Sequence, residues 1–216
     1  MCNLYDIGPS SNTNLSAWQR AVREAIEAAP KEFGIRKTDP GIVARLDEDG
    51  SDMEPVGMRW GFHREFNPAI NNARSDKLSG RMWNKAWREK RRCLIPVSTF
   101  YEWSGPTGSK LTHAFQGEDA ELWMGGLWEK NSKEDIGSSY TMLTTNASDQ
   151  VSQIHNRMPA ILRETDFDEF LNGENPTHLL EPFSGDLKIF DCENPLRKKP
   201  EDHQGPVPIA MLPGFE

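Results

Sequence analysis

The segment that most constrains the fold is an apolar run in the middle of the chain, from Cys93 to Trp103. Its β-branched and aromatic residues predict a buried β-strand. The run ends in Phe100-Tyr101-Glu102-Trp103, so a carboxylate stands among three aromatic side chains. Burial raises the pKa of such a carboxyl and costs free energy unless a partner compensates. Glu102 is therefore either a functional acid or the structural ion-pair partner of an arginine.

Strand and turn signals alternate over much of the remaining chain. Runs between turn residues predict strands at residues 42–46, 58–62, 111–116, 121–128, 139–145 and, more weakly, 186–191. An acidic hairpin tip is predicted at 47–52, and a polar, irregular loop at 63–80. The last forty residues are polar and rich in proline, which indicates an irregular, partly mobile tail.

Two segments show ordinary helix signals. Ser16 and Gln19 have the spacing of a capping box, which predicts a helix that ends near Ala29, before Pro30. A short helix with acidic residues in its first turn is predicted at residues 165–172, with Thr165 as its cap.

A third helix is predicted at residues 81–92, and it is strongly basic. It combines an apolar stripe with six basic residues and one acidic residue. The charge indicates either a solvated face or an electrostatic footprint for phosphates. In the second case Arg81, Lys85 and Arg88 would contact nucleic acid.

Length and composition limit the class of protein. A chain of 216 residues is enough for one large domain or two small ones. No apolar run approaches 18 residues and the first residues are neither basic nor apolar, so we expect no transmembrane helix and no signal peptide. Cys2, Cys93 and Cys192 are widely spaced, which predicts a reduced cytoplasmic protein without disulfides, metal or cofactor. The net charge of −8 argues against nucleic acid, although a polyanion responds to the local patch.

The most specific chemistry is predicted at Met1-Cys2. If Met1 is removed, Cys2 carries a thiol and a primary α-amine on adjacent carbons. Their ordinary pKa values, near 8.5 and 7.7–8.0, leave roughly a tenth of each group reactive at neutral pH. A 1,2-aminothiol traps aldehydes, because the amine forms a Schiff base and the thiolate then closes a five-membered thiazolidine. Taken alone, however, a cysteine at position 2 is most often incidental.

Five further residues supply what reversible capture of a sugar aldehyde needs. Glu102 could open the closed sugar, and His155 could move protons on and off the carbinolamine. Asn72 could hold the freed hydroxyl, and Arg74 and Arg157 could clamp flanking phosphates. Each also has a structural interpretation, since His155 fits a core or surface histidine and Asn72 fits a turn residue.

These residues belong to motifs that follow one another in a fixed order. The motifs are Met1-Cys2, Met58-Arg59-Trp60-Gly61-Phe62, Asn72-Ala73-Arg74-Ser75-Asp76, Arg92-Cys93-Leu94-Ile95-Pro96, Phe100-Tyr101-Glu102-Trp103, Gly126-Leu127-Trp128-Glu129, Leu143-Thr144-Thr145-Asn146-Ala147 and His155-Asn156-Arg157-Met158-Pro159. As an ordered set over roughly residues 1–165, they resemble the SRAP family, the SOS-response-associated peptidases, known as proteins that crosslink to abasic sites in single-stranded DNA. The resemblance implies a single compact α+β domain at residues 1–195, with a curved, barrel-like mixed β-sheet flanked by helices. Residues 196–216 would form the irregular tail.

The resemblance implies a role for each matching residue of the reactive centre. Cys2 would form the thiazolidine with the abasic aldehyde, and Asn72 would bind the ring-opened deoxyribose. Glu102 would assist ring opening and, in an autopeptidase activity, the removal of Met1. His155 would be the general acid and base for Schiff-base formation and for slow reversal.

The resemblance also implies a DNA groove. Flanking phosphates would be bound by Arg74, Arg157, Thr144 and Thr145, and a stacking or wedge surface would be formed by Trp60 and Pro40. The implied partners are single-stranded DNA with abasic sites and replication-fork proteins. We expect a monomer associated with the nucleoid that acts in the SOS response.

The chain departs from the family pattern in three places, one of which is the segment after Trp60-Gly61, where the usual Pro-x-Trp is missing. Many members begin Cys-Gly-Arg, with that arginine on a phosphate, whereas here Asn3 and Leu4 follow Cys2. Many also have glutamate where this chain has Asp76. The basic segment at residues 81–92 could substitute for the missing arginine.

Two other functions fit the same residues. An N-terminal-nucleophile hydrolase would acylate the Cys2 thiol, use His155 as base, and turn over a peptide or amide. A non-catalytic single-stranded DNA module would leave Cys2 idle and bind intact and abasic strands equally. Stoichiometric capture of abasic DNA that depends on Cys2 would separate the first function from both alternatives.

Overall fold

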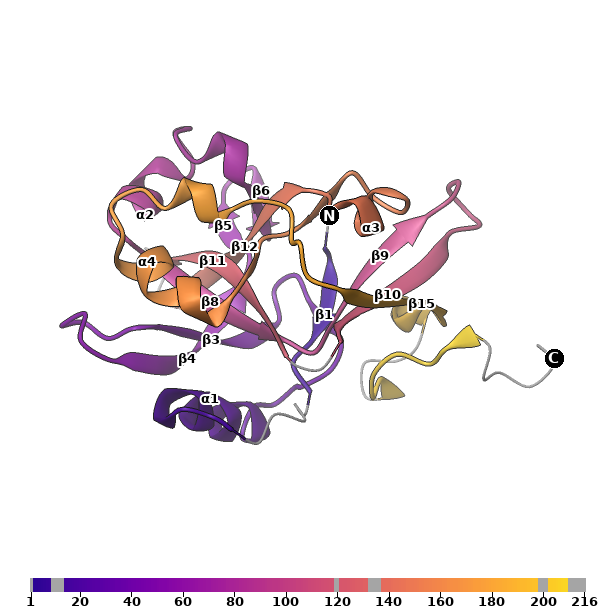
Figure 1. The fold of residues 1–216 in the computed structure, drawn as a ribbon, viewed down its shortest axis with the longest axis horizontal. Coiled ribbons are helices and arrows are strands. Elements are labelled where there is room, and N and C mark those ends of the chain that lie inside the picture. The colour runs from indigo at the N-terminus through magenta and orange to yellow at the C-terminus, as the bar shows by residue number, and fades with distance from the viewer. Residues whose placement is uncertain (1, 9–13, 119–120, 132–136, 198–201, 210–216) are drawn as a thin grey trace.

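A closed ring of strands forms the centre of the molecule (Figure 1). The computed structural model describes all residues except 1, 9–13, 119–120, 132–136, 198–201 and 210–216. The ring runs through β12 (Ser138–Asn146), β4 (Met53–Trp60), β3 (Pro40–Leu46), β8 (Arg92–Val97) and β11 (Leu122–Lys130). It closes because β11 pairs with both β8 and β12.

Short strands extend the ring at its rim, and they make the sheet mixed. They are β13 (Arg157–Pro159), β14 (Ile161–Leu162) and β7 (Asn72–Arg74). Both β4 and β7 lie parallel to β12, whereas the other pairs are antiparallel. The expected α+β fold with a curved, barrel-like mixed sheet is confirmed.

A second, antiparallel sheet lies against the ring and carries the N-terminal strand. Its order is β15 (Leu187–Cys192), β10 (Leu111–Gly117), β9 (Thr99–Ser104), β1 (Leu4–Asp6) and β2 (Ile35–Arg36). In this register Tyr5 of β1 pairs with Phe100 of β9. A separate hairpin is formed by β5 (Phe62–Arg64) and β6 (Asn67–Ile70).

The apolar run from Cys93 to Trp103 joins the two sheets. We expected one strand here, and this was wrong, because the run divides at Ser98 into β8 and β9. The backbone N–H of Ser98 donates to the carbonyl of Asp6 at 2.8 Å, so the chain leaves the ring and pairs with β1. This switch brings Glu102 beside the N-terminal strand.

Helices cover the outside of the ring. α1 (Ala17–Glu27) begins with the predicted capping box, in which Ser16 and Gln19 each accept from the other's backbone N–H. The remaining helices are short: α2 (Asn84–Arg88), α3 (Asp149–Ser152), α4 (Phe167–Asn172) and the 3₁₀ turns η1 (Ser75–Lys77), η2 (Glu164–Asp166), η3 (Thr177–Leu179) and η4 (Pro195–Arg197). None of the helices among the described residues is long and apolar enough to cross a membrane.

Three local predictions were wrong. Residues 81–92 hold only the five-residue helix α2, since Lys90 turns at φ 53° and Arg92 already belongs to β8. Residues 63–80 contain strands and a 3₁₀ turn, because their backbone pairs within the β5–β6 hairpin and with β12. The hydroxyl of Thr165 bonds the carboxylate of Asp166 instead of capping a helix.

The tail after β15 is partly anchored. The backbone of Cys192 forms an isolated antiparallel β-bridge with that of Pro208, and His203 is buried against the smaller sheet. There the imidazole of His203 lies 3.0 Å from a carboxylate oxygen of Asp6, and the Tyr101 hydroxyl donates to the same carboxylate at 2.5 Å. The tail therefore touches β1, which begins two residues after Cys2, and β9, which carries Glu102.

Candidate functional site

The first residues of the chain hold Cys2 inside the protein. Its side chain is completely buried, and the thiol donates to the carbonyl of Leu4 at 3.3 Å. The Cys2 carbonyl accepts two amide hydrogen bonds, from Nδ2 of Asn72 at 2.8 Å and from Nδ2 of Asn71 at 3.2 Å. Strand β7 and the residue before it thus fix the backbone at Cys2.

Asn71 is a site residue that sequence reasoning missed. Its amide also donates to the side chain of Asn3 at 3.2 Å. Its own carbonyl accepts from the indole N–H of Trp60 and from the backbone N–H of Met142, both at 3.0 Å. Nothing in the sequence separates Asn71 from other asparagines in a polar segment, and only its position next to Asn72 gave a signal.

Asn72 retains an unused acceptor in the site. Its Oδ1 is buried and has no hydrogen-bond partner among the described residues. Leaving a buried acceptor unpaired costs free energy, so the site gains when a ligand donates to it. A hydroxyl group is a ligand of this kind.

Glu102 and Cys2 influence each other electrostatically. Glu102 is buried, and this burial raises the pKa of its carboxyl, while positive charge, including that of His155, opposes the shift. Burial also raises the pKa of the Cys2 thiol to about 12, and the negative charge of Glu102 adds to this increase. The resting thiol is therefore protonated at neutral pH, and the sequence-based value near 8.5 does not apply inside the fold.

His155 follows α3 and completes this charged group. The backbone N–H of Arg157 donates to Nδ1 of His155 at 3.0 Å. Nδ1 also lies 3.1 Å from the carbonyl of Arg157, so it accepts from the N–H in one tautomer of the neutral imidazole and donates to the carbonyl in the other. The structure thus brings together Cys2, Asn72, Glu102 and His155, which are spread over more than 150 positions of the sequence.

Two arginines lie next to each other on β7 and β13. Nε and a terminal nitrogen of Arg74 donate to the two carboxylate oxygens of Asp76 at 3.0 and 2.8 Å. Arg157 lies 3.5 Å from the same carboxylate. It is held by Asn146 and by the carbonyl of Thr144 at 2.9 and 2.5 Å. Burial and the neighbouring charge of Arg74 lower the pKa of Arg157.

Three residues that were predicted to contact DNA are buried instead. Trp60 cannot offer a stacking surface, because its side chain is fully buried between Tyr5 and Tyr140. Thr144 and Thr145 are also buried. The Thr145 hydroxyl donates to the carbonyl of Leu180, so neither threonine is placed to bind a phosphate. All three residues are buried for the same reason, because the side chains at inward-facing strand positions pack into the core.

Other predicted contact residues do face solvent. Pro40 is exposed at the start of β3. Arg81, Lys85 and Arg88 are exposed, with Arg81 in the turn before α2 and the other two on the helix. Arg88 also lines a cavity of about 330 Å³ together with Asp76, so this basic segment adjoins the arginine pair.

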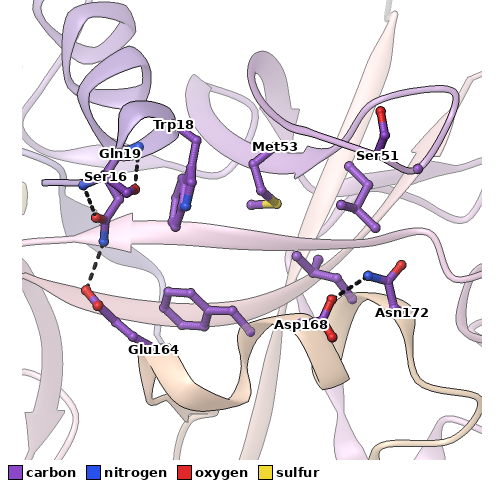
Figure 2. A pocket seen from close by; sticks show the side chains of 12 residues that line it. Ser16, Trp18, Gln19, Ser51, Met53, Glu164, Asp168 and Asn172 are labelled. Atoms are coloured by element: carbon purple, nitrogen blue, oxygen red, sulfur yellow. Dashed lines mark hydrogen bonds between the residues drawn. The ribbon is translucent and has the colours of Figure 1, made fainter.

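A separate cavity of about 340 Å³ lies beneath α1 (Figure 2). Trp18 and Met53 form part of its apolar wall, and Glu164 and Asp168 stand at its edge. Gln19 donates to Glu164 at 2.8 Å and Asn172 donates to Asp168 at 2.7 Å, so amide groups satisfy both carboxylates. No predicted site residue lines this cavity. Nor does any part of the described chain gather three side chains as metal ligands.

Comparisons with known proteins agree with this arrangement. A family model described as SOS response associated peptidase (SRAP) matches residues 1–196. The abasic site processing protein YoqW of Bacillus subtilis is 29% identical over 159 residues, covering 67% of this chain and 71% of YoqW. The abasic site processing protein HMCES of Gallus gallus is 31% identical over 165 residues, covering 60% of this chain and 49% of HMCES.

Solved structures share the fold. A protein from Bordetella bronchiseptica superposes with a TM-score of 0.70 at 23% identity, covering 89% of this chain and 100% of that one. A protein from Bacteroides thetaiotaomicron has the same TM-score at 19% identity, with coverage of 89% and 96%.

Proposed function

Since the chain belongs to the SOS response associated peptidase family, we propose that it captures abasic sites in single-stranded DNA as a covalent crosslink through Cys2. The observation that carries the proposal is the buried group in which Asn72 holds Cys2 while Glu102 and His155 lie within electrostatic reach. Relatives named as abasic site processing proteins support the same target. The crosslink would shield the lesion during replication.

The first chemical step is the formation of a Schiff base. Removal of Met1 frees the α-amine of Cys2. Glu102, whose raised pKa favours the neutral acid, donates a proton to the ring oxygen of the closed sugar as the bond from that oxygen to the anomeric carbon breaks. The anomeric hydroxyl returns a proton to the Glu102 carboxylate, which leaves the aldehyde. The amine adds to the aldehyde carbon to give a carbinolamine, and loss of water leaves the imine. The freed hydroxyl donates to the unpaired Oδ1 of Asn72.

The second step closes the ring. The Cys2 sulfur adds to the imine carbon, and the thiol proton passes to the imine nitrogen, so one water is lost overall. The thiol pKa of about 12 means that a base must take the proton during attack. The imidazole of His155 is the group suited to this transfer, and the same shuttle acts in reverse when the ring opens.

The two arginines bind the strand on either side of the lesion. Arg74 and Arg157 are close enough to share one anion, as their common contact with Asp76 indicates. The exposed Arg81, Lys85 and Arg88 extend the positive surface. An associated autopeptidase activity, with Glu102 assisting the removal of Met1, fits the same centre.

The protonated thiol favours this function over an N-terminal-nucleophile hydrolase. Acyl transfer begins with attack by the thiolate, which burial disfavours here. Aldehyde capture begins with the amine instead, and the thiol acts second.

The deciding experiment is a crosslinking assay with a synthetic single strand that contains one abasic site. Wild-type protein, checked by intact mass for loss of Met1, should give a heat-stable shifted band at a stoichiometry near one. Cys2→Ala should give none, and an intact strand should give none with either protein. A band of wild-type yield with Cys2→Ala would overturn the proposal, and repeated turnover of a peptide library would favour the hydrolase.

A further inference from the structure

We propose that Asp76 is a built-in competitor of DNA phosphate, whose carboxylate occupies the anion position between Arg74 and Arg157. The inference rests on the proposed function and adds a residue that sets how tightly the strand is held. Asp76 would have to give up both arginines before a phosphate could bind them. DNA affinity would then be lower than the two arginines alone would provide.

The contact with Arg74 has the geometry of phosphate recognition. Asp76 accepts from Nε and from a terminal nitrogen of Arg74 with separate oxygens, at 3.0 and 2.8 Å. Arginine binds phosphate in the same bidentate way, with two parallel N–H donors on two oxygens. A phosphate on Arg74 and the Asp76 carboxylate therefore exclude each other.

The contact with Arg157 makes the carboxylate a bridge. A terminal nitrogen of Arg157 lies 3.5 Å from the oxygen of Asp76 that Arg74 Nε also contacts. One anion thus faces two guanidinium groups, and the positive charge of Arg74 lowers the pKa of the Asp76 carboxyl. The carboxylate is charged at neutral pH and cancels one of the two positive charges.

Arg157 does not depend on Asp76 for its orientation. Its two terminal nitrogens donate to Asn146 and to the carbonyl of Thr144, both fixed on β12. Arg74 is more exposed, with half of its side chain surface open to solvent, but its backbone is fixed by the pairing of β7 with β12. Removing the carboxylate should therefore leave Arg157 in place and the guanidinium of Arg74 available to a phosphate from a fixed backbone.

Displacing the Asp76 carboxylate from the two arginines costs little free energy. The Arg74–Asp76 pair lies at the surface, with 51% and 45% of the side chains exposed, and such pairs contribute little stability. A displaced Asp76 stays in contact with water, and it also lines the cavity that Arg88 lines. A backbone phosphate offers the same charge to both arginines and releases counterions from the DNA, so it can win the exchange.

The test measures binding of a lesion-free single strand, so that phosphate contacts are separated from covalent chemistry. Asp76→Asn keeps the size of the side chain and removes its charge. The matched control is Asp49→Asn, which makes the same change in net charge at the exposed tip between β3 and β4. Binding of a fluorescent oligothymidine would be titrated by anisotropy at several salt concentrations.

We expect Asp76→Asn to bind about 3- to 10-fold more tightly than wild type at low salt. Its plot of log affinity against log salt should steepen by roughly 0.7, the slope for one additional phosphate contact on a single strand. Asp49→Asn should stay within about twofold of wild type, because a single remote charge is screened. Equal or weaker binding by Asp76→Asn would overturn the inference, and weaker binding would make Asp76 a positioning residue for Arg74.

The two experiments distinguish a failure of this inference from a failure of the proposed function. If wild type fails to crosslink an abasic strand while Asp76→Asn still binds oligothymidine more tightly, the crosslinking proposal fails and the competitor role stands. If crosslinking occurs and Asp76→Asn gains no affinity, only the competitor role fails.

Discussion

The side-chain amide of Asn72 donates a 2.8 Å hydrogen bond to the backbone carbonyl of Cys2. The same side chain keeps a buried, unpaired oxygen on its other side. Asn72 therefore connects Cys2, the proposed nucleophile, with the place where a sugar hydroxyl would arrive. The position uses both groups of an amide, because the N–H donates to Cys2 while the oxygen remains available to accept from a ligand.

Replacing Asn72 with Ala should slow crosslinking more than it weakens binding. We expect the single-turnover rate with an abasic strand to fall by about 10-fold or more, the cost of one buried hydrogen bond. Affinity for a lesion-free strand should change by less than about twofold. Asn131→Ala is the control, because Asn131 also donates one side-chain bond, to Ser139, at a distant place. Equal losses in rate and affinity would argue that Asn72 only supports the fold.

Cys2→Ser should separate the two chemical steps. The variant keeps the α-amine, so a Schiff base should still form and should be trapped by cyanoborohydride. Without a sulfur nucleophile the stable ring should not form, and unreduced adducts should dissociate on heating. A heat-stable adduct without reductant would show that the thiol is dispensable. Acetylation of the amine should abolish both products.

Cys2 should also alkylate slowly. A thiol pKa of about 12 leaves far less thiolate at pH 7.5 than a free cysteine has. Reaction with iodoacetamide in the native protein should be at least about 10-fold slower than in the denatured protein. A native rate equal to the denatured rate would mean that the thiol is ionised in the site.

Glu102→Gln should stabilise the protein while reducing its activity. The raised pKa means that the folded state binds this proton more tightly than the unfolded state, so Glu102 costs stability as pH rises above its unfolded pKa. The variant should therefore melt about 2 °C or more above wild type at pH 7, and the difference should vanish near pH 4. Crosslinking should slow by about 100-fold. A lower melting temperature at pH 7 would indicate a compensated ion pair instead.

His155→Ala should slow crosslinking and its reversal together, each by about 100-fold, because one proton shuttle serves both directions. Reversal can be followed by transfer of the DNA to excess aminothiol. The control is His178→Ala, at an exposed histidine that contacts Glu169. An unchanged reversal rate in His155→Ala would contradict the shared role.

The sequence predicted the strands better than it predicted their partners. Runs between turn residues located β3, β10, β11 and β12, and the capping box located α1. It could not locate the break at Ser98, because both halves of that run are apolar and the break depends on the distant carbonyl of Asp6. The polar segment at 63–80 looked irregular for a related reason, since its strand β7 is stabilised by β12, which is remote in sequence.

The candidate site was predictable only in part. Cys2, Asn72, Glu102 and His155 carried recognisable chemistry, and the fold brings them together. Trp60 was misassigned because burial cannot be read from residue type, and an indole suits a core as well as a base-stacking surface. Asn71 and Asp76 acquire their importance from hydrogen-bond geometry, which a single sequence does not encode locally.

The pairing of β1 with β9 has a consequence for synthesis. Tyr5 pairs with Phe100, about 95 residues later, and His203 reaches Asp6 from near the other end of the chain. At about 5–20 residues per second, a ribosome makes β1 several seconds before its partner strand exists. During that interval β1 has only β2 to pair with, so one of its edges, and the N-terminus with it, is open to enzymes outside the ribosome. The reactive centre is thus one of the last parts of the nascent protein to be enclosed, although its nucleophile is among the first residues made.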